Sequence, residues 1–339
     1  MIKTLQAGRA IAALCVAAFH LSIMMGSPRY GGEEIFGAYT RQGNRGVDFF
    51  FVLSGFIILF AHFKDIGKPE ALSNYIYRRF ARLFPIYWLY TIVFVGLLAI
   101  VGGTDAKMPS GAIDWITSLT LIRFTDVTPP LPVAWTLFHE VAFYATFATL
   151  IFNRRLGVTA FLLVIVISII FYDFPTQESN TPFNVYTSAY NLYFLFGMGA
   201  YWLYRRGGSG ILEFTFGLVI FSLTIAEVLI PNQILPITMA LGMALLLAAA
   251  TKLEASGKIK LPNFIAIVGD ASYTIYLTHL NFQGNILKFM KASKLQSIAG
   301  NEITYFIVLI GTIALGCLAY FLIEKPLLGF LRKFGRKME

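Results

Sequence analysis

Apolar runs of about 20 residues follow one another along most of this chain, and a helix of that length crosses the hydrocarbon core of a bilayer. Of the 339 residues, 57% are hydrophobic, and the mean hydropathy is +0.69. Charged residues make up 13%, against about 25% in soluble domains. Because lipid offers no hydrogen-bond partners, each backbone amide in such a run must be bonded within its own segment. The sequence therefore predicts an all-α integral membrane protein.

Polar or Gly/Pro clusters separate these runs, which predicts a bundle of about ten transmembrane helices in one membrane domain over residues 1–339. The predicted spans are residues 5–26, 46–63, 82–103, 132–152, 156–172, 187–205, 211–230, 233–251, 262–282 and 302–324. The fifth span is short, and Pro236 interrupts the eighth. Membrane helices tolerate such a proline where neighbouring groups satisfy the freed carbonyl.

Most of the 27 lysine and arginine residues fall on one side of this arrangement when the N-terminus is placed in the cytoplasm. The exceptions are Arg29, Arg41, Arg45, Lys107, Arg123, Lys288, Lys291 and Lys294. By the positive-inside rule, both termini are predicted to be cytoplasmic. The same distribution accounts for the formal charge of +9, because the cations occupy short loops without an RNA-binding motif. We therefore expect no nucleic-acid partner.

The first apolar run carries two residues that are costly inside a bilayer, Arg9 and His20. On a helix they lie on one stripe, separated by about 16 Å along the axis. One interpretation is that each side chain reaches the nearer membrane interface. The other is that both are functional, as ionisable residues within membrane spans usually are.

The second run contains Asp48 at its predicted outer end and Ser54 two turns deeper. Asp48 either caps the start of the helix or faces His20 across the bundle. Ser54 and Gly55 are typical of a small-residue contact between closely packed helices, which is the interpretation we favour for this pair.

A dense cationic cluster leads into the third run. Arg79 and Arg82, three residues apart, share a helix face and can hold a phosphate through two guanidinium groups. Anchoring of the span at the cytoplasmic interface explains the two arginines equally well.

The fourth run begins with Trp135, His139 and Glu140, and the first two are spaced i, i+4. A carboxylate beside an imidazole inside a membrane favours a functional interpretation over a structural one. His279 closes the ninth predicted span and is either an interface residue or part of the same site.

The polar residues are predicted at two different depths in the membrane. His20, Asp48, His139, Glu140 and His279 are predicted in the outer half of the bundle, while the arginines lie toward the cytoplasm, where a phosphate-rich donor would dock. The zinc-hydrolase motifs HExxH and CxxC are absent, as are G-x-S-x-G and P-loop sequences. We therefore expect no metal site.

The chain resembles the membrane-bound acyltransferase 3 family, and its exopolysaccharide-type members most of all. The resemblance covers nearly the whole chain, and its order and spacing are more specific than any one block. The blocks are Leu5-Gln6 with Arg9 and His20 as R-x10-H, Gly46–Phe56, Arg79 and Arg82 with Pro85 and Tyr87, Trp135–Tyr144, Ser272–His279, and Ile323–Pro326.

Two features depart from the family pattern. Ala7, Gly8 and Ala10 surround Arg9, where a leucine before and a glycine after the arginine are more usual. Val141 follows Glu140 where many members have a second acid, which argues against a mechanism that needs two adjacent carboxylates. We expect a stand-alone acyltransferase domain without an SGNH-type hydrolase extension.

The resemblance implies transfer of an acyl group, acetyl above all, from cytoplasmic acyl-CoA to a sugar hydroxyl on a surface glycan or its lipid-linked precursor, in the bacterial cytoplasmic membrane. Acyl-CoA is then a donor substrate, and no cofactor is permanently bound. The implied catalytic residues are His20, as general base or acyl carrier, with Glu140 and Asp48. Arg9, Arg79 and Arg82 would hold the donor, and the acceptor would contact Ser54, Trp135, His139, Tyr144 and His279.

Two other functional classes use the same features. A glycolipid transporter or flippase would use the polar interior as a passage, and transport would then survive loss of His20. A scaffold in a polysaccharide-export complex would not depend on acyl-CoA.

Overall fold

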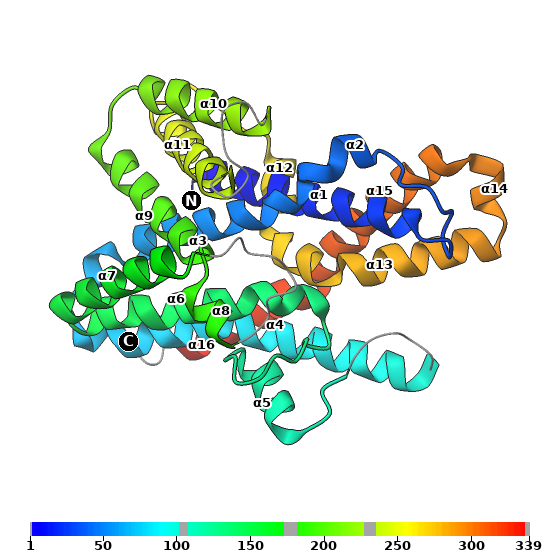
Figure 1. Ribbon diagram of the computed structural model, residues 1–339, viewed down its shortest axis with the longest axis horizontal. Helices are drawn as coiled ribbons and strands as arrows, with labels where there is room; N and C mark the ends of the chain where they lie inside the picture. The colour runs from blue at the N-terminus through cyan, green and yellow to red at the C-terminus, as the bar shows by residue number, and fades with distance from the viewer. Residues whose placement is uncertain (1, 102–107, 173–181, 227–234, 336–339) are drawn as a thin grey trace. The chain divides into compact units, whose positions relative to one another are not determined.

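The computed structural model describes residues 2–101, 108–172, 182–226 and 235–335, and every regular element in these ranges is helical (Figure 1). The α-helices are α1 (Lys3–Gly26), α2 (Gly37–Thr40), α3 (Gly46–His62), α4 (Leu72–Val101), α5 (Ala112–Thr120), α6 (Trp135–Phe152), α7 (Arg154–Ile170), α8 (Pro182–Thr187), α9 (Tyr190–Arg206), α10 (Ile211–Ile225), α11 (Leu235–Ala255), α12 (Asn263–Asp270), α13 (Ser272–Ala292), α14 (Leu295–Ala299), α15 (Asn301–Ala319) and α16 (Lys325–Gly335). Short 3-10 turns are η1 (Arg41–Arg45), η2 (Phe63–Asp65), η3 (Pro69–Ala71) and η4 (Pro132–Ala134), and η5 (Tyr320–Glu324) is a π-helical turn. The all-α prediction is confirmed for the described residues.

Within the described residues, 6 segments are long and apolar enough to cross a membrane. They are Lys3–Gly26, Gly37–Asp65, Pro69–Leu98, Pro132–Phe152, Leu235–Ala255 and Asn301–Phe334. The other predicted spans correspond to the shorter helices α7, α9 and α10 and to the more polar α13. The chain is thus a helical membrane protein, and the count of about ten spans and the cytoplasmic placement of both termini remain predictions. Predicted span ends at residues 102–103, 227–230 and 233–234 lie outside the described residues.

The third and ninth predicted spans differ from the helices observed, and α4 begins at Leu72 rather than at residue 82. The ninth span was predicted as one helix over 262–282, but the chain breaks at Ala271 between α12 and α13, and α13 continues to Ala292. The break follows Gly269, where an added Cβ would lie 2.1 Å from the backbone oxygen of Gln6, so only glycine permits this close approach to α1. Pro236 is the second described residue of α11, and the chain before Leu235 lies outside the described residues, so the predicted interruption at Pro236 stays a prediction.

Internal contacts divide the chain into two compact units. The first unit comprises Met1–Phe50 and Leu253–Leu327, and the second comprises Phe51–Lys252 and Leu328–Glu339. The expectation of a single functional membrane domain stays a prediction.

The first unit is built around α1. This helix packs against α12 and α13, and α13 packs along α15 (Figure 1). A buried apolar cluster that includes Leu21, Met25, Leu287 and Tyr305 joins the three long helices near the C-terminal end of α1.

The second unit is built around α6, which packs against α4, α7 and α9. Its closest helix contact joins α3 and α9. A Cβ added at Gly55 would lie 1.9 Å from the backbone oxygen of Phe194, and one added at Gly197 would lie 1.9 Å from that of Val52. The two backbones therefore touch, as in the small-residue contacts of membrane helices. This contact fixes Ser54, beside Gly55, relative to the rest of the unit.

Candidate functional site

The residues singled out from the sequence fall into both units. The first unit holds Arg9, His20, Asp48 and His279, and the second holds Ser54, Arg79, Arg82, Trp135, His139, Glu140 and Tyr144. Each unit forms a polar cluster of its own.

In the first unit, α1 and α13 bring two histidines together across 259 residues of sequence. Nε2 of His279 lies 3.3 Å from Nδ1 of His20, and the ring centroids are 5.0 Å apart. His279 is only 1% exposed, while His20 is half-buried. The prediction that His279 closes its helix is wrong, because α13 begins at Ser272 and His279 lies in its second turn.

Backbone acceptors select the tautomers of both rings. Nδ1 of His20 lies 2.9 Å from the carbonyl oxygen of Val16, and Nδ1 of His279 lies 2.7 Å from that of Tyr276. A carbonyl oxygen only accepts, so each Nδ1 carries the proton. The Nδ1–H of His20 is then shared between Val16 and the lone pair on Nε2 of His279. Neither contact uses Nε2 of His20, and that nitrogen keeps its lone pair for a proton.

Arg9 lies on the same helix α1, N-terminal to His20. Its Nε donates to Oγ of Ser272 at 3.1 Å, at the start of α13. Since Arg9 and His20 on α1 meet Ser272 and His279 on α13 in the same order, the two helices run in the same direction. The stripe predicted on α1 is therefore a stripe that faces α13.

Asp48 is buried in the first turn of α3, where its carboxylate also suits the positive end of the helix dipole. Its Oδ2 accepts from Nη1 of Arg45 at 3.3 Å. The hydrogen bonds of His20, by contrast, go to Val16 and His279. The ring of His20 is therefore oriented by these two groups, and a catalytic role for Asp48 stays a prediction.

In the second unit, Glu140 is the centre of the polar cluster. Its Oε1 accepts a hydrogen bond from Oγ of Ser54 at 3.2 Å and another from the hydroxyl of Tyr144 one turn later on α6. The interpretation of Ser54 and Gly55 as a small-residue helix contact thus describes Gly55, which makes the backbone contact with α9. Ser54 instead directs its hydroxyl to the carboxylate of Glu140.

Arg79 lies beside this cluster. Its guanidinium is 5.9 Å from the ring centroid of Tyr75 and 5.8 Å from that of Tyr144, and the hydroxyl of Tyr75 donates to the backbone oxygen of Tyr144 at 3.0 Å. Arg82, one turn further along α4, is half-buried. Arg79 is thus held beside two aromatic rings, and the choice between phosphate binding and interface anchoring stays open for both arginines.

Sequence reasoning missed His62, which joins Arg79 to the end of α3. Nε2 of His62 lies 3.3 Å from Nη2 of Arg79, and Nδ1 lies 2.8 Å from Oδ2 of Asp65. The side chain is 4% exposed. An available signal was the spacing of His62 and Asp65, three residues apart at the end of an apolar run.

Arg123 was counted only as a charge on the outer side, but it is buried. Its guanidinium lies 4.3 Å from the ring centroid of Phe138 and donates to the backbone oxygen of Val127. Burial lowers the pKa of this group from its usual value. Arg123 therefore holds the loop before α6 in place, and no sequence signal distinguished it from a solvated charge.

Trp135 and His139 contact each other as their spacing predicts, with ring centroids 6.0 Å apart. His139 is enclosed by aromatic rings, at 5.8 Å from Phe51 and 5.0 Å from Tyr190. These rings account for the burial of His139, and its role in acceptor binding stays a prediction. Trp135 is half-buried, which leaves part of its ring for a ligand.

Comparison with known proteins adds one family and one relative. Residues 2–321 match the family model Acyl_transf_3, described as an acyltransferase domain. The exopolysaccharide production protein ExoZ of Rhizobium meliloti (strain 1021) is 30% identical over 320 residues, which cover 88% of this chain and 94% of the relative. No solved structure matches the chain.

Proposed function

This chain belongs to the acyltransferase 3 family, and from that premise we propose that it transfers an acyl group, acetyl above all, from cytoplasmic acyl-CoA to a hydroxyl of an exopolysaccharide or its lipid-linked precursor. The name of the relative ExoZ supports the acceptor class. The apolar helices support a location in a membrane, which we assign to the bacterial cytoplasmic membrane as a multi-pass protein.

The proposed chemistry rests on which ring nitrogen of His20 carries the proton. Its Nδ1–H faces the carbonyl of Val16 and Nε2 of His279, so Nε2 of His20 is the basic nitrogen. In the proposed reaction, this nitrogen takes the proton of the sugar hydroxyl as the oxygen attacks the thioester carbonyl. The C–S bond breaks, and the thiolate of CoA leaves. In the alternative route, Nε2 attacks the thioester itself and carries the acyl group to the sugar.

The other residues divide between donor and acceptor. Arg9, Arg79 and Arg82 hold the phosphates or the thioester of the donor through charge-assisted hydrogen bonds. Glu140, which accepts hydrogen bonds from Ser54 and Tyr144, binds the acceptor hydroxyls, and the exposed part of Trp135 stacks on a sugar ring.

The function is tested with purified protein in lipid nanodiscs, labelled acetyl-CoA and a lipid-linked glycan. We expect label in the glycan. A transporter would move the glycolipid without labelling it, and a scaffold would give the same result with and without acyl-CoA. Chemical analysis of surface glycan acylation in strains with and without the gene identifies the acylated sugar.

Replacing Arg79 separates donor binding from membrane anchoring. Loss of a charge-assisted hydrogen bond weakens acyl-CoA binding by about tenfold to a hundredfold, so Arg79→Ala should raise the Kd for CoA by that factor and leave acceptor binding unchanged. Arg78→Ala is the matched control, because Arg78 is the exposed neighbour of Arg79 on α4 and its Nε donates to Oδ1 of Asn74. Equal Kd values for CoA in both variants would return Arg79 to the anchoring interpretation.

Replacing Glu140 with glutamine keeps the shape of the side chain and removes its charge. Since Ser54 and Tyr144 both donate to this carboxylate, Glu140→Gln should lower the turnover of acyl transfer by about tenfold or more and leave the Kd for CoA unchanged. Ser54→Ala, which removes one donor only, should have a smaller effect. The measurement is steady-state transfer with titrated acceptor, and unchanged turnover in Glu140→Gln would remove this residue from the site.

A further inference from the structure

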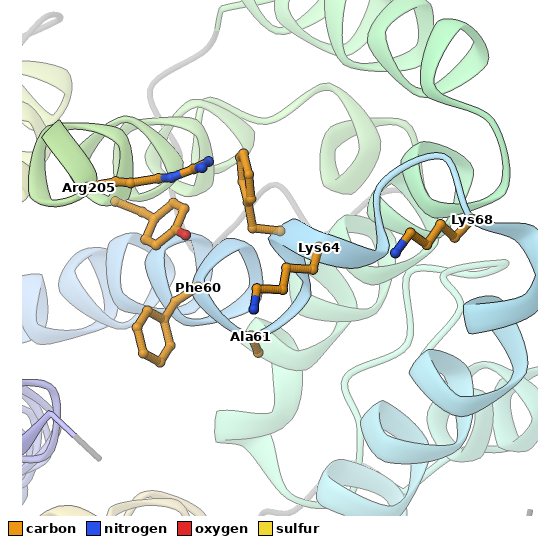
Figure 2. A pocket seen from close by; sticks show the side chains of 7 residues that line it. Phe60, Ala61, Lys64, Lys68 and Arg205 are labelled. Atoms are coloured by element: carbon orange, nitrogen blue, oxygen red, sulfur yellow. The ribbon is translucent and has the colours of Figure 1, made fainter. Parts of the chain in front are cut away.

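A cationic pocket lies in the second unit, away from the residues that the sequence singled out. It has a volume of about 550 Å³ and lies where the C-terminal end of α3 and η2 face the C-terminal end of α9 (Figure 2). That size falls within the range of about 300–1,000 Å³ common for small-molecule sites. The charge distribution predicts that these helix ends face the cytoplasm, from which a soluble donor would arrive.

Three cations line this pocket. Lys64 and Lys68 extend from the segment that follows α3, and Arg205 approaches from α9 (Figure 2). Within the described residues, no carboxylate pairs with the ammonium group of either lysine. Cations gathered around one concavity without counter-charges create a field that attracts an anion.

Arg205 is held in a geometry that suits an anion. Its guanidinium lies 3.9 Å from the ring centroid of Phe63 and 5.9 Å from that of Trp202. Stacking uses the flat face of the group and leaves its N–H edges free to donate in the plane, as in bidentate recognition of phosphate. The aromatic wall thus orders the arginine in advance of binding.

The same wall offers aromatic surface to a ligand. Phe60 is 43% exposed and lies 6.0 Å from the ring of Tyr201, which also lines the pocket. Cations beside aromatic rings are the combination that recognises a nucleotide, because the phosphates pair with the cations and the base stacks on a ring.

A chain of contacts leads from the pocket to Arg79. Lys64 precedes Asp65 in η2, Asp65 bonds Nδ1 of His62, and Nε2 of His62 lies 3.3 Å from the guanidinium of Arg79. Arg79 in turn lies beside Tyr144, which donates to Glu140. The pocket and the Glu140 cluster are therefore joined by direct side-chain contacts within this unit.

We propose that this pocket binds the phosphorylated nucleotide end of the acyl-CoA donor through Lys64, Lys68 and Arg205, with Arg79 contacting the part of the donor nearer its thioester. This inference rests on the proposed acyl-CoA-dependent function and adds to it a nucleotide subsite. Phosphate is also the headgroup chemistry of anionic lipids, so the experiment separates the two sources.

The test uses the full-length protein in nanodiscs and measures the Kd for CoA, for 3′-dephospho-CoA and for adenosine 3′,5′-bisphosphate. Lys64→Ala, Lys68→Ala and Arg205→Ala should each raise the Kd for CoA and for the bisphosphate by about tenfold to a hundredfold. At least one of them should also abolish the preference of the parent for CoA over the dephosphorylated form. The matched control is Arg206→Ala, since Arg206 is exposed, adjacent to Arg205 and outside the pocket.

Transfer assays provide the second readout. With acetyl-CoA the pocket variants should have a raised KM and an unchanged kcat, and with acetyl-pantetheine, which lacks the nucleotide, they should equal the parent.

Nucleotide affinities equal to that of Arg206→Ala would overturn the pocket assignment while leaving the proposed function intact. The pocket assignment would also be overturned if the variants lost only the binding of phosphatidylglycerol. This is measured by comparing nanodiscs of phosphatidylglycerol with nanodiscs of phosphatidylcholine. A parent protein that binds no CoA would overturn the proposed function and this inference together.

Discussion

His20→Ala is expected to lower the rate of acyl transfer by about two to four powers of ten, the usual contribution of a positioned general base. Nδ1 of His20 is engaged by the carbonyl of Val16 and by His279, and Nε2 is the nitrogen left to accept a proton. The measurement is transfer from labelled acetyl-CoA to the lipid-linked glycan at saturating donor. Binding of CoA should be unchanged, because the effect falls on the chemical step.

The matched control is Cys15→Ala on the same helix, because Cys15 is exposed. His279→Ala should have a smaller effect than loss of His20, since Val16 still holds the ring. Rapid denaturation at neutral pH of the enzyme with labelled acetyl-CoA and no acceptor distinguishes the two routes, because only an acyl carrier retains label on the protein and an acylimidazole would hydrolyse in acid. Full transfer by His20→Ala would reject both routes and return Arg9 and His20 to the interpretation as interface residues.

The second large effect is expected on folding. Gly197→Ala places a methyl group 1.9 Å from the backbone oxygen of Val52, and Gly55→Ala places one 1.9 Å from that of Phe194. Neither neighbour is a flexible side chain, so α3 and α9 must separate, at a cost of about 3 kcal/mol or more. Separation would also withdraw Ser54 from Glu140. We expect little monodisperse protein in detergent and a strongly lowered melting temperature.

Gly199→Ala is the control for this prediction. Gly199 lies on the same helix two residues from Gly197, and an added Cβ there meets no atom within 4 Å. Alanine is favoured over glycine in a helix by about 1 kcal/mol, so this variant should be as stable as the parent or more so. Equal melting temperatures for Gly197→Ala and Gly199→Ala would contradict the close crossing of α3 and α9.

Local features of the sequence predicted where the long apolar helices lie. Apolar runs of about 20 residues need no distant partner to indicate a helix in a membrane, and α1, α3 and α6 begin within a few residues of their predicted starts. Contacts within one helix were equally readable, as for Trp135 and His139, because their spacing alone brings them together. The break at Ala271 was missed, as was the close approach of Gly269 beside it to Gln6, which lies on another helix.

The sequence by itself thus determined that this is a helical membrane protein, and its motifs selected the arginines, histidines and Glu140 as candidates. Only the tertiary structure decided which atoms meet. The contacts between His20 and His279, between Ser54 and Glu140, and between Arg79 and His62 join residues on different helices. Hydropathy and residue spacing indicate that a segment is helical and lies in a membrane. The rotation and depth of each helix relative to its neighbours are decided by packing. For Gly55 the sequence indicated a close helix contact, but only the structure identifies Phe194 on α9 as its partner.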